Sequence, residues 1–323
     1  MKKNPTAGSF TLSKNGINHE KNEKWGVFMK FISFEWEGKE QYGVVYDEKK
    51  ILNLSQIRLK ESSFPEGLLE GIRQGEEFTG RVEQVLAKPE AALAAFFVPM
   101  QEIRFLPPIP HPPKNIICVG KNYRDHAIEM GSAKDIPEHV IVFTKATTTV
   151  NAHLVPIDSH RDATKELDYE GELAVIIGKK GSRIDKKDAL SHVFGYTILN
   201  DVTARDLQRI HKQYFIGKSL DGSCPIGPWI VHHSKIKNPN QLDITTKVNG
   251  EVRQHSNTEN FIFPIEEIIS ELSKGMTLEP GDIIATGTPA GVGNGFNPPR
   301  FLVPGDEVEI TIEGIGTLYN KVK

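Results

Sequence analysis

The stretch from Lys114 to the C-terminus most limits the possible folds, because it is a succession of short, β-branched segments. Gly, Pro or Asp separates neighbouring segments, as in tight turns between strands. The segments are NIICVG, HVIVFTK, GELAVIIG, FGYTILND, PWIVHH, DITTKVNG, DIIATG and DEVEITIEG. Helices are expected at residues 122–130, 203–215 and 264–273. Strands and helices do not alternate regularly enough for a doubly wound parallel sheet, so the pattern predicts a β-rich α/β domain.

Residues 29–105 have a different pattern and predict a small α+β domain. KFISFEWEGKEQYGVVYDEKKILNL predicts three short strands, with turns at Glu37-Gly38 and Asp47-Glu48, and an interrupted helical pattern follows. Residues 106–113, LPPIPHPP, contain five prolines and predict an extended linker. Residues 1–28 are polar and without periodicity, which predicts a disordered leader or an upstream extension. The larger domain then covers residues 114–323.

Composition narrows the classes of partner. The net charge of -3, without a basic block, disfavours nucleic acid. No apolar run reaches the roughly 20 residues of a membrane helix, and MKKNPTAGSF lacks the apolar stretch of a secretory signal. Cys118 and Cys224 are too few for a disulfide framework, although one paired disulfide stays open. We therefore expect a cytoplasmic protein that acts on a small molecule.

Acidic residues gather in KELDYEGELAVIIG, residues 165–178. In a strand, alternation places Asp168, Glu170 and Glu172 on one face, roughly 6–7 Å apart in succession, so that two carboxylates can share a cation. The following AVIIG is apolar enough to be buried, where unpaired carboxylates are costly. On periodicity alone, a solvated acidic strand edge explains the spacing equally well. Without a Cys/His cluster of zinc spacing, the cation would be Mg²⁺ or Mn²⁺.

A further acid, Asp201, ends the predicted strand GYTILND. A carboxylate at the end of a strand is a common site residue. A helix is expected to begin near Thr203, so Asp201 could instead be its N-cap, and taken alone the cap is the favoured interpretation.

Two pairs of residues have helical spacing suited to a site. His126 and Glu129 are three apart, so on a helix the carboxylate can fix the imidazole tautomer and raise its basicity. A charged surface helix is the alternative. Arg205 and Gln208 have the same spacing and could both face a ligand.

The loop ATGTPAGVG, residues 285–293, predicts a substrate loop. Its glycines allow close approach of the backbone, and the hydroxyl of Thr286 or Thr288 can donate to a carboxylate. A dinucleotide fingerprint is disfavoured because Pro289 interrupts the glycine spacing.

Over residues 114–322 the chain resembles the fumarylacetoacetate hydrolase family. The matching motifs are ICVGKNYRDHAIEMG, LDYEGELAVIIG, NDVTARDLQ, GKSLDGSCPIGPWIV, VNGEVRQ and MTLEPGDIIATGTPAGVG. The resemblance implies a twisted β-roll and a homodimer. It also implies that Glu170, Glu172 and Asp201 bind the Mg²⁺ or Mn²⁺, which leaves Asp168 as a structural acid beside the ligands.

The resemblance further assigns roles around the metal. His126 and Glu129 would form a catalytic pair on a lid, and Lys218 would supply positive charge near a developing enolate. The substrate would be bound by residues that share cationic or hydrogen-bonding side chains or loop position: Lys145, Arg205, Gln208, Thr286, Gly287 and Thr288. The chain departs from the commonest family form at Ala146, where that form has proline.

The implied activity is metal-dependent cleavage of a C–C bond in a 2-oxo acid through a metal-stabilised enolate. Oxaloacetate decarboxylation is the leading prediction. Hydrolysis of an acylpyruvate of the fumarylpyruvate or fumarylacetoacetate type is the alternative, followed by isomerisation or decarboxylation of a 2-hydroxymuconate-type acid. The leader and the N-terminal domain, which the chemistry does not need, also leave open a regulatory protein on this scaffold.

Overall fold

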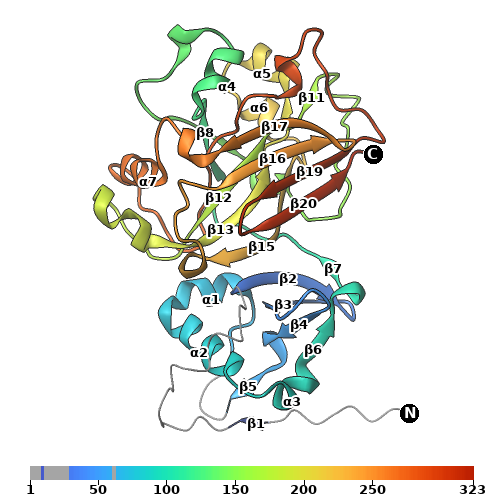
Figure 1. Ribbon diagram of the computed structural model, residues 1–323, viewed down its shortest axis with the longest axis vertical. Coiled ribbons are helices and arrows are strands. Elements are labelled where there is room, and N and C mark those ends of the chain that lie inside the picture. Colours follow the sequence, from blue (N-terminus) through green and yellow to red (C-terminus); the bar gives the residue numbers. More distant parts are fainter. Residues whose placement is uncertain (1–8, 11–28, 60–62) are drawn as a thin grey trace.

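Residues 29–105 form a small sheet with helices at one end of the molecule (Figure 1). The computed structural model describes residues 9–10, 29–59 and 63–323, so the predicted leader lies outside the described residues except for β1 (Ser9–Phe10), which pairs with β5 (Arg58–Leu59). The sheet order is β6-β4-β3-β2. Its strands are β2 (Lys30–Trp36), β3 (Lys39–Val45), β4 (Lys50–Asn53) and β6 (Phe97–Pro99). The predicted hairpin turn is present, with positive φ at both Glu37 and Gly38, as a two-residue turn requires.

Three helices and one short strand complete this part. The interrupted helical pattern becomes two helices that meet at Gly75, and a further short helix precedes β6. The elements are α1 (Leu68–Gln74), α2 (Glu76–Leu86), α3 (Glu90–Leu93) and β7 (Arg104–Phe105). Within α2, the buried side chains Phe78, Val82 and Val85 follow helical spacing, so one apolar face packs on the small sheet.

The small sheet continues into the sheet of the larger part. β2 pairs antiparallel with β15, with Phe31 opposite Ile230, and the order continues β15-β13-β12-β18-β8-β9. The described residues therefore share one 12-stranded sheet, to which β7 and β10 (Val150–Asn151) also belong. Its remaining strands are β8 (Ile116–Gly120), β9 (Ile141–Lys145), β12 (Gly171–Ile177), β13 (Val193–Asn200), β15 (Cys224–His232) and β18 (Ile283–Ala285).

A four-stranded sheet packs against this long sheet and closes the main core. Its order is β17-β16-β19-β20, and its inward side chains, such as Ile244 and Ile310, join the same apolar cluster as Leu173 and Val175 of β12. Alternate residues of β19 are buried, as expected for a strand with one face on a core. The strands are β16 (Asp243–Val248), β17 (Glu251–Asn257), β19 (Glu307–Ile312) and β20 (Gly316–Lys321).

Short helices gather at the end of the molecule opposite residues 29–105 (Figure 1). They are α4 (Arg124–Glu129), α5 (Arg205–His211) and α6 (Phe215–Lys218), while α7 (Ile265–Ser273) covers one side. The two-residue strands β11 (Leu167–Asp168) and β14 (Thr203–Ala204) pair with each other near the same end. The predicted β-rich α/β fold is confirmed.

Several local predictions are wrong in their bounds. The helix expected at 203–215 is two helices, because Lys212 has a φ of 55° and ends α5. The helix expected at 122–130 is shorter, since Asn122 is committed to other contacts and Tyr123 is the N-cap. The acidic segment is not one continuous strand, because Tyr169 and Glu170 separate β11 from β12.

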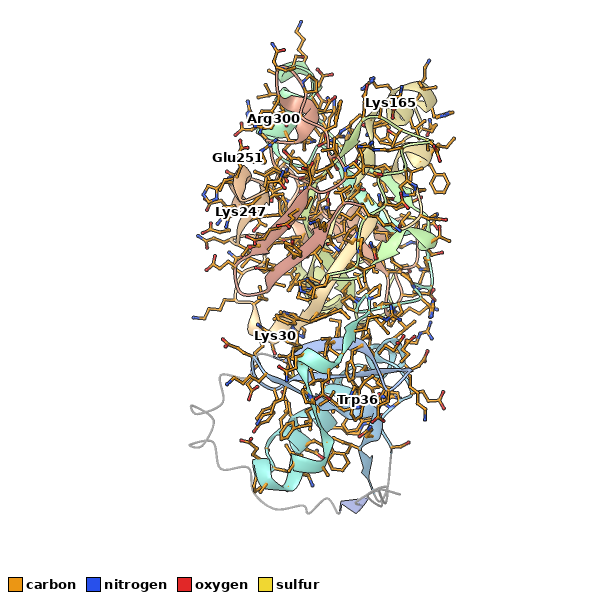
Figure 2. The ribbon with its side chains drawn as sticks, turned by 90° about the vertical axis from the view of Figure 1, so that its right-hand side faces the viewer. Lys30, Trp36, Lys165, Lys247, Glu251 and Arg300 are labelled. Carbon is orange, nitrogen blue, oxygen red and sulfur yellow. The ribbon has the colours of Figure 1, made fainter. Side chains whose placement is uncertain are left out.

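The proline-rich residues 106–113 lie against the small sheet. The Leu106 N–H donates to the Ser33 carbonyl, and the Ser33 hydroxyl donates 2.8 Å to the Pro108 carbonyl oxygen. Ile109 is buried in the core that the two parts share. In a view turned by 90°, Lys30 lies at the boundary between the parts, with Nζ 4.7 Å from the centre of the Trp229 ring (Figure 2).

Two expectations from composition can be compared with the structure. Cys118 and Cys224 are both buried and free, so the open alternative of a disulfide is wrong. Among the described residues, each helix is too short or too polar to span a bilayer.

Candidate active site

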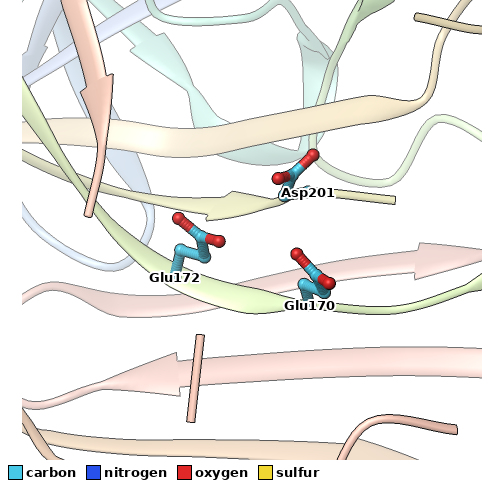
Figure 3. Close-up of side chains that lie close together, drawn as sticks. All are labelled: Glu170, Glu172 and Asp201. Atoms are coloured by element: carbon cyan, nitrogen blue, oxygen red, sulfur yellow. The ribbon is translucent and has the colours of Figure 1, made fainter. Parts of the chain in front are cut away.

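Strand pairing brings the three predicted ligands together. β12 and β13 are antiparallel, with Gly171 opposite Asn200, and the Asp201 N–H donates 2.8 Å to the Glu170 carbonyl oxygen. Asp201 at the end of β13 therefore lies beside Glu170 and Glu172, and one carboxylate oxygen of each lies within 4.8 Å of the others (Figure 3).

Both simpler interpretations of these acids are wrong. Glu170 is 5% exposed, Glu172 1% and Asp201 0%, so they are not a solvated strand edge. Asp201 is not a helix cap either, because α5 begins at Arg205 and its N-cap is Ala204.

Buried cations compensate two of the three acids. Lys218 Nζ lies 2.7 Å from both Glu170 Oε2 and Asp201 Oδ2, and Arg205 Nη2 lies 2.8 Å from Glu170 Oε1. Burial by itself would raise the pKa of Glu170, but Lys218 and then Arg205 outweigh it and lower that pKa to about 2. Burial would likewise lower the pKa of Lys218, whereas Asp201 and Glu170 raise it, so the ammonium is charged at neutral pH.

Glu172 is different, because no cationic side chain of the described residues pairs with it. Its Oε2 accepts one hydrogen bond, 2.8 Å from the Gly287 N–H. Burial, and then the charges of Asp201 and Glu170, raise its pKa well above the usual value. A divalent cation between the three carboxylates would supply the missing positive charge, and oxygen-only donors suit Mg²⁺ or Mn²⁺. The residues present therefore fit the predicted metal.

Asp168 lies beside the three acids and fixes a loop. Its Oδ2 accepts from Arg205 Nε at 2.8 Å and from the Asn294 N–H at 3.0 Å, and its Oδ1 accepts from the Gly293 N–H at 2.7 Å. Arg205 in turn donates to Gln208 Oε1 through Nη1. Asp168 thus positions Arg205 and the loop after Gly287, in keeping with the structural role predicted for it.

His126 and Glu129 form a hydrogen-bonded pair on α4. His126 Nδ1 lies 3.1 Å from Glu129 Oε2, and Glu129 Oε1 accepts from the Gly291 N–H at 2.9 Å. His126 is 5% exposed, so the alternative of a charged surface helix is wrong. With Nδ1 engaged by the carboxylate, Nε2 is the ring nitrogen left for a ligand.

These groups surround one cavity of about 280 Å³. Seven of the residues predicted for the site line it: His126, Glu170, Glu172, Arg205, Gln208, Lys218 and Thr288. The sequence reasoning missed the remaining lining residues: Val119, Gly120, Lys121, Met130, Phe143, Arg209, Tyr214 and Asn294. Lys121 stands inside the motif ICVGKNYRDHAIEMG and so has a signal there, whereas Tyr214 falls between two motifs and nothing in the strand IVFTK marks Phe143.

The other five predicted residues lie outside this lining: Glu129, which orients His126, Asp201, and three residues predicted to bind substrate. Lys145 is fully buried, with Nζ 2.9 Å from both Asp201 Oδ1 and the Val202 carbonyl oxygen. The Thr286 hydroxyl donates to the Leu173 carbonyl, and Gly287 is behind the acids as the donor to Glu172. In this structure Lys145 and Gly287 therefore support the acids, Thr286 is bonded to the backbone of β12, and none of the three lines the cavity.

The departure from the family pattern at Ala146 has a local reason. The Ala146 N–H donates 3.0 Å to Ser219 Oγ, next to Lys218. Proline has no N–H, so this hydrogen bond between the end of β9 and α6 needs a residue other than proline.

Comparison with known proteins identifies the family. Residues 115–323 match the family model described as fumarylacetoacetate (FAA) hydrolase C-terminal. The chain belongs to this family. It is 53% identical to the oxaloacetate tautomerase of Bacillus subtilis, over 91% of this chain and 100% of the relative. The predicted family and the prediction of an enzyme are confirmed.

Solved structures give the same result for the fold. A fumarylacetoacetate hydrolase from Exiguobacterium antarcticum superposes with a TM-score of 0.78 at 43% identity, covering 91% of this chain and 99% of that one. A maleylpyruvate hydrolase from Sphingobium, solved with manganese(II) and pyruvate, has a TM-score of 0.72 at 29% identity, over 91% and 98% of the two chains. The predicted fumarylacetoacetate hydrolase-type fold is therefore confirmed.

Proposed function

We propose that this enzyme interconverts the enol and keto forms of oxaloacetate at a divalent cation held by Glu170, Glu172 and Asp201. The observation that carries the proposal is that Glu170 and Glu172 of this acidic triad line one cavity together with His126, whose ring is oriented by Glu129. The activity named for the Bacillus subtilis relative supports the choice of substrate. Mg²⁺ or Mn²⁺ is the proposed cation, and manganese in the Sphingobium hydrolase supports it.

Held by Glu170, Glu172 and Asp201, such a cation would supply a Lewis acid for the 2-oxo carboxylate end of the substrate, which would make the C3 protons more acidic. The buried ammonium of Lys218 adds positive charge on the same wall of the cavity. Arg205 and Lys218 keep Glu170 ionised, which its pKa of about 2 reflects, and so keep it available as a ligand. Arg205 and Gln208, joined by a hydrogen bond, border the space where the 2-oxo acid would lie.

His126 is the proposed proton carrier. With Nδ1–H donating to Glu129, Nε2 has a free lone pair and can take a proton from C3, leaving an enolate. Transfer of this proton from His126 to the C2 oxygen gives the enol, and its return from His126 to C3 gives the keto acid. No atom is lost and no second reactant is required, so the sequence is an isomerisation.

Decarboxylation, the leading prediction from the sequence, remains a second candidate. In that reaction the C3–C4 bond breaks, its electrons pass to the C2 oxygen, and CO₂ leaves. The lining Lys218 favours it as well, because charge develops on the same C2 oxygen in both reactions. Acylpyruvate hydrolysis would instead use His126 to activate water, and the similarity to the Sphingobium maleylpyruvate hydrolase supports this alternative.

A substrate panel tests the proposal. The decay of enol oxaloacetate, pyruvate formation from oxaloacetate and cleavage of an acylpyruvate are measured with Mg²⁺ or Mn²⁺ and with EDTA, after subtraction of the uncatalysed rates. We expect tautomerisation to be the fastest and to stop in EDTA. His126→Asn should lower its kcat by about 10²- to 10⁴-fold, as for loss of a general base.

The matched control is His255→Asn, because His255 is exposed and hydrogen-bonded to Thr245. It should leave the rate unchanged. Tautomerisation that persists in EDTA, or in His126→Asn, contradicts the mechanism. Faster acylpyruvate cleavage contradicts only the choice of reaction.

A further inference from the structure

Among the cations that line the cavity, Lys121 is the one that has no ion pair with a described residue. Among the described residues, four cationic side chains line the cavity: Lys121, Arg205, Arg209 and Lys218. Arg205 pairs with Asp168 and Glu170, and Lys218 pairs with Glu170 and Asp201. Arg209 is exposed and pairs with Glu166, at 2.7 Å. No acid of the described part of the chain lies within ion-pair distance of Lys121. Hydrogen bonding to Ser132 is the main cause that lowers the pKa of Asp135, and the charge of Lys121 lowers it as a lesser cause.

The backbone holds Lys121 in an unusual conformation. Its φ is 53°, in the left-handed region that costs a non-glycine residue about 1 kcal/mol or more. The next residue fixes it there, because the Asn122 side chain is fully buried and bonded to both the N–H and the carbonyl of Phe263 and to the Thr286 carbonyl. The chain therefore turns sharply between the end of β8 and α4, where Lys121 reaches the cavity half-buried.

We infer that Lys121 binds the second carboxylate of the substrate, so that the site selects 2-oxo dicarboxylates over 2-oxo monocarboxylates. The inference rests on the proposed function and extends it to a residue that selects the substrate. The C1 carboxylate and C2 oxygen belong at the acidic triad, and the C4 carboxylate of oxaloacetate then needs a cation elsewhere on the wall. Lys121 is the cation that this carboxylate can pair with without displacing an internal ion pair.

Pairing at Lys121 also affects which bond breaks. Decarboxylation removes the negative charge from the C4 carboxylate as CO₂ forms, so a cation bound to that group stabilises the substrate more than the transition state. Tautomerisation leaves the C4 carboxylate charged throughout, so the same ion pair is kept. Lys121 therefore favours tautomerisation over decarboxylation.

The substitution Lys121→Met removes the charge and keeps an unbranched side chain at this φ. Two measurements on the full-length Mg²⁺-loaded protein test it. Calorimetry compares malate with lactate, which differ in the second carboxylate. Kinetics compare oxaloacetate tautomerisation with the exchange of pyruvate methyl protons for deuterium. We expect malate affinity to fall and the KM of oxaloacetate to rise by about tenfold, the loss of one charge-assisted hydrogen bond. Lactate binding and pyruvate exchange should stay within about twofold, and CO₂ release per tautomerisation event should rise.

Controls separate this role from a structural one. Lys121→Arg should restore malate binding, Lys121→Asn should resemble Lys121→Met because Asn tolerates positive φ, and Lys134→Met alters an exposed lysine outside the cavity. Equal losses for malate and lactate, or no loss for either, overturn the inference and leave the proposed function intact. A wild-type protein that enolises neither oxaloacetate nor pyruvate overturns both.

Discussion

The floor of the cavity, by which we mean Glu170, Lys218 and the adjoining Asp201, and the junction between the two parts of the chain are both buried, but they are stabilised in opposite ways. At the cavity floor, Glu170 and Asp201 share the ammonium of Lys218. At the junction, β2 pairs with β15, and Phe31 packs at 5.2 Å from the Phe194 ring. The stability of the cavity floor depends on each buried charge having a partner of opposite charge. The stability of the junction depends on the apolar surface that is buried there.

The difference predicts different kinds of failure. A buried ion is tolerated only while its partner is present, so loss of one member leaves an uncompensated charge. Apolar packing loses stability in proportion to the area and volume removed, whichever side chain provides them. Damage to the cavity floor should therefore affect stability and chemistry together, whereas damage to the junction should affect stability alone.

The largest expected effect is that of Lys218→Met. It leaves Glu170 and Asp201 without their shared ammonium, so the free energy of unfolding in EDTA should fall by about 3–5 kcal/mol, and tautomerisation should be lost. Urea unfolding measures the first and the enol assay the second. The control Lys247→Met removes an exposed ion pair with Glu309 (Lys247 is labelled in Figure 2) and should cost less than about 1 kcal/mol. Equal losses for the two lysines contradict the comparison.

Phe31→Ala tests the junction with a comparable loss of stability. Phe31 is fully buried between Phe78, Phe194 and His232, so its truncation should cost about 3–4 kcal/mol in urea unfolding. Phe31→Leu keeps most of the volume and should cost less. The kcat of the folded fraction should equal that of the wild type in both. A lower kcat would mean that the junction also positions the site.

A smaller effect is expected from pH, through two histidines of the boundary region. Burial lowers the pKa of both His153 and His232 to about 4, from 6.5. Both are neutral in the folded protein, whereas the unfolded chain takes up protons below pH 6.5. Stability should therefore fall as the pH drops from 6.5 towards 4, by on the order of 1–3 kcal/mol per histidine. Urea unfolding across this range measures the slope, and His232→Phe should make it shallower. An unchanged slope contradicts the assignment.

The smallest expected change in stability is that of Glu172→Gln. Glu172 has no cationic partner among the described residues, so its neutralisation should leave stability in EDTA unchanged or raise it by up to about 1 kcal/mol. The rise in melting temperature on adding Mg²⁺ should disappear. Glu170→Gln removes the negative charge that pairs with both Lys218 and Arg205, so it should instead lower the free energy of unfolding in EDTA. If the two variants behave alike, the distinction between the paired and unpaired acids fails.

The sequence by itself determined the local parts of this protein. Turn residues and β-branched runs predicted the short strands, because these preferences act within a few residues. The spacing of His126 and Glu129 predicted their contact for the same reason, since three residues make one helical turn. The family motifs predicted Glu170, Glu172 and Asp201 as a set, which periodicity alone left undecided.

Tertiary structure decided how distant segments meet. Antiparallel register places Asp201 beside Glu170, and three-dimensional distance decides that Lys145 pairs with Asp201 while Lys121 lines the cavity. The pairing of β2 with β15 could not be read from a proline-rich stretch that suggested separation. Burial and charge matching act between residues far apart in the chain, so they fix which of several suitable side chains faces a ligand only when the whole sheet has formed.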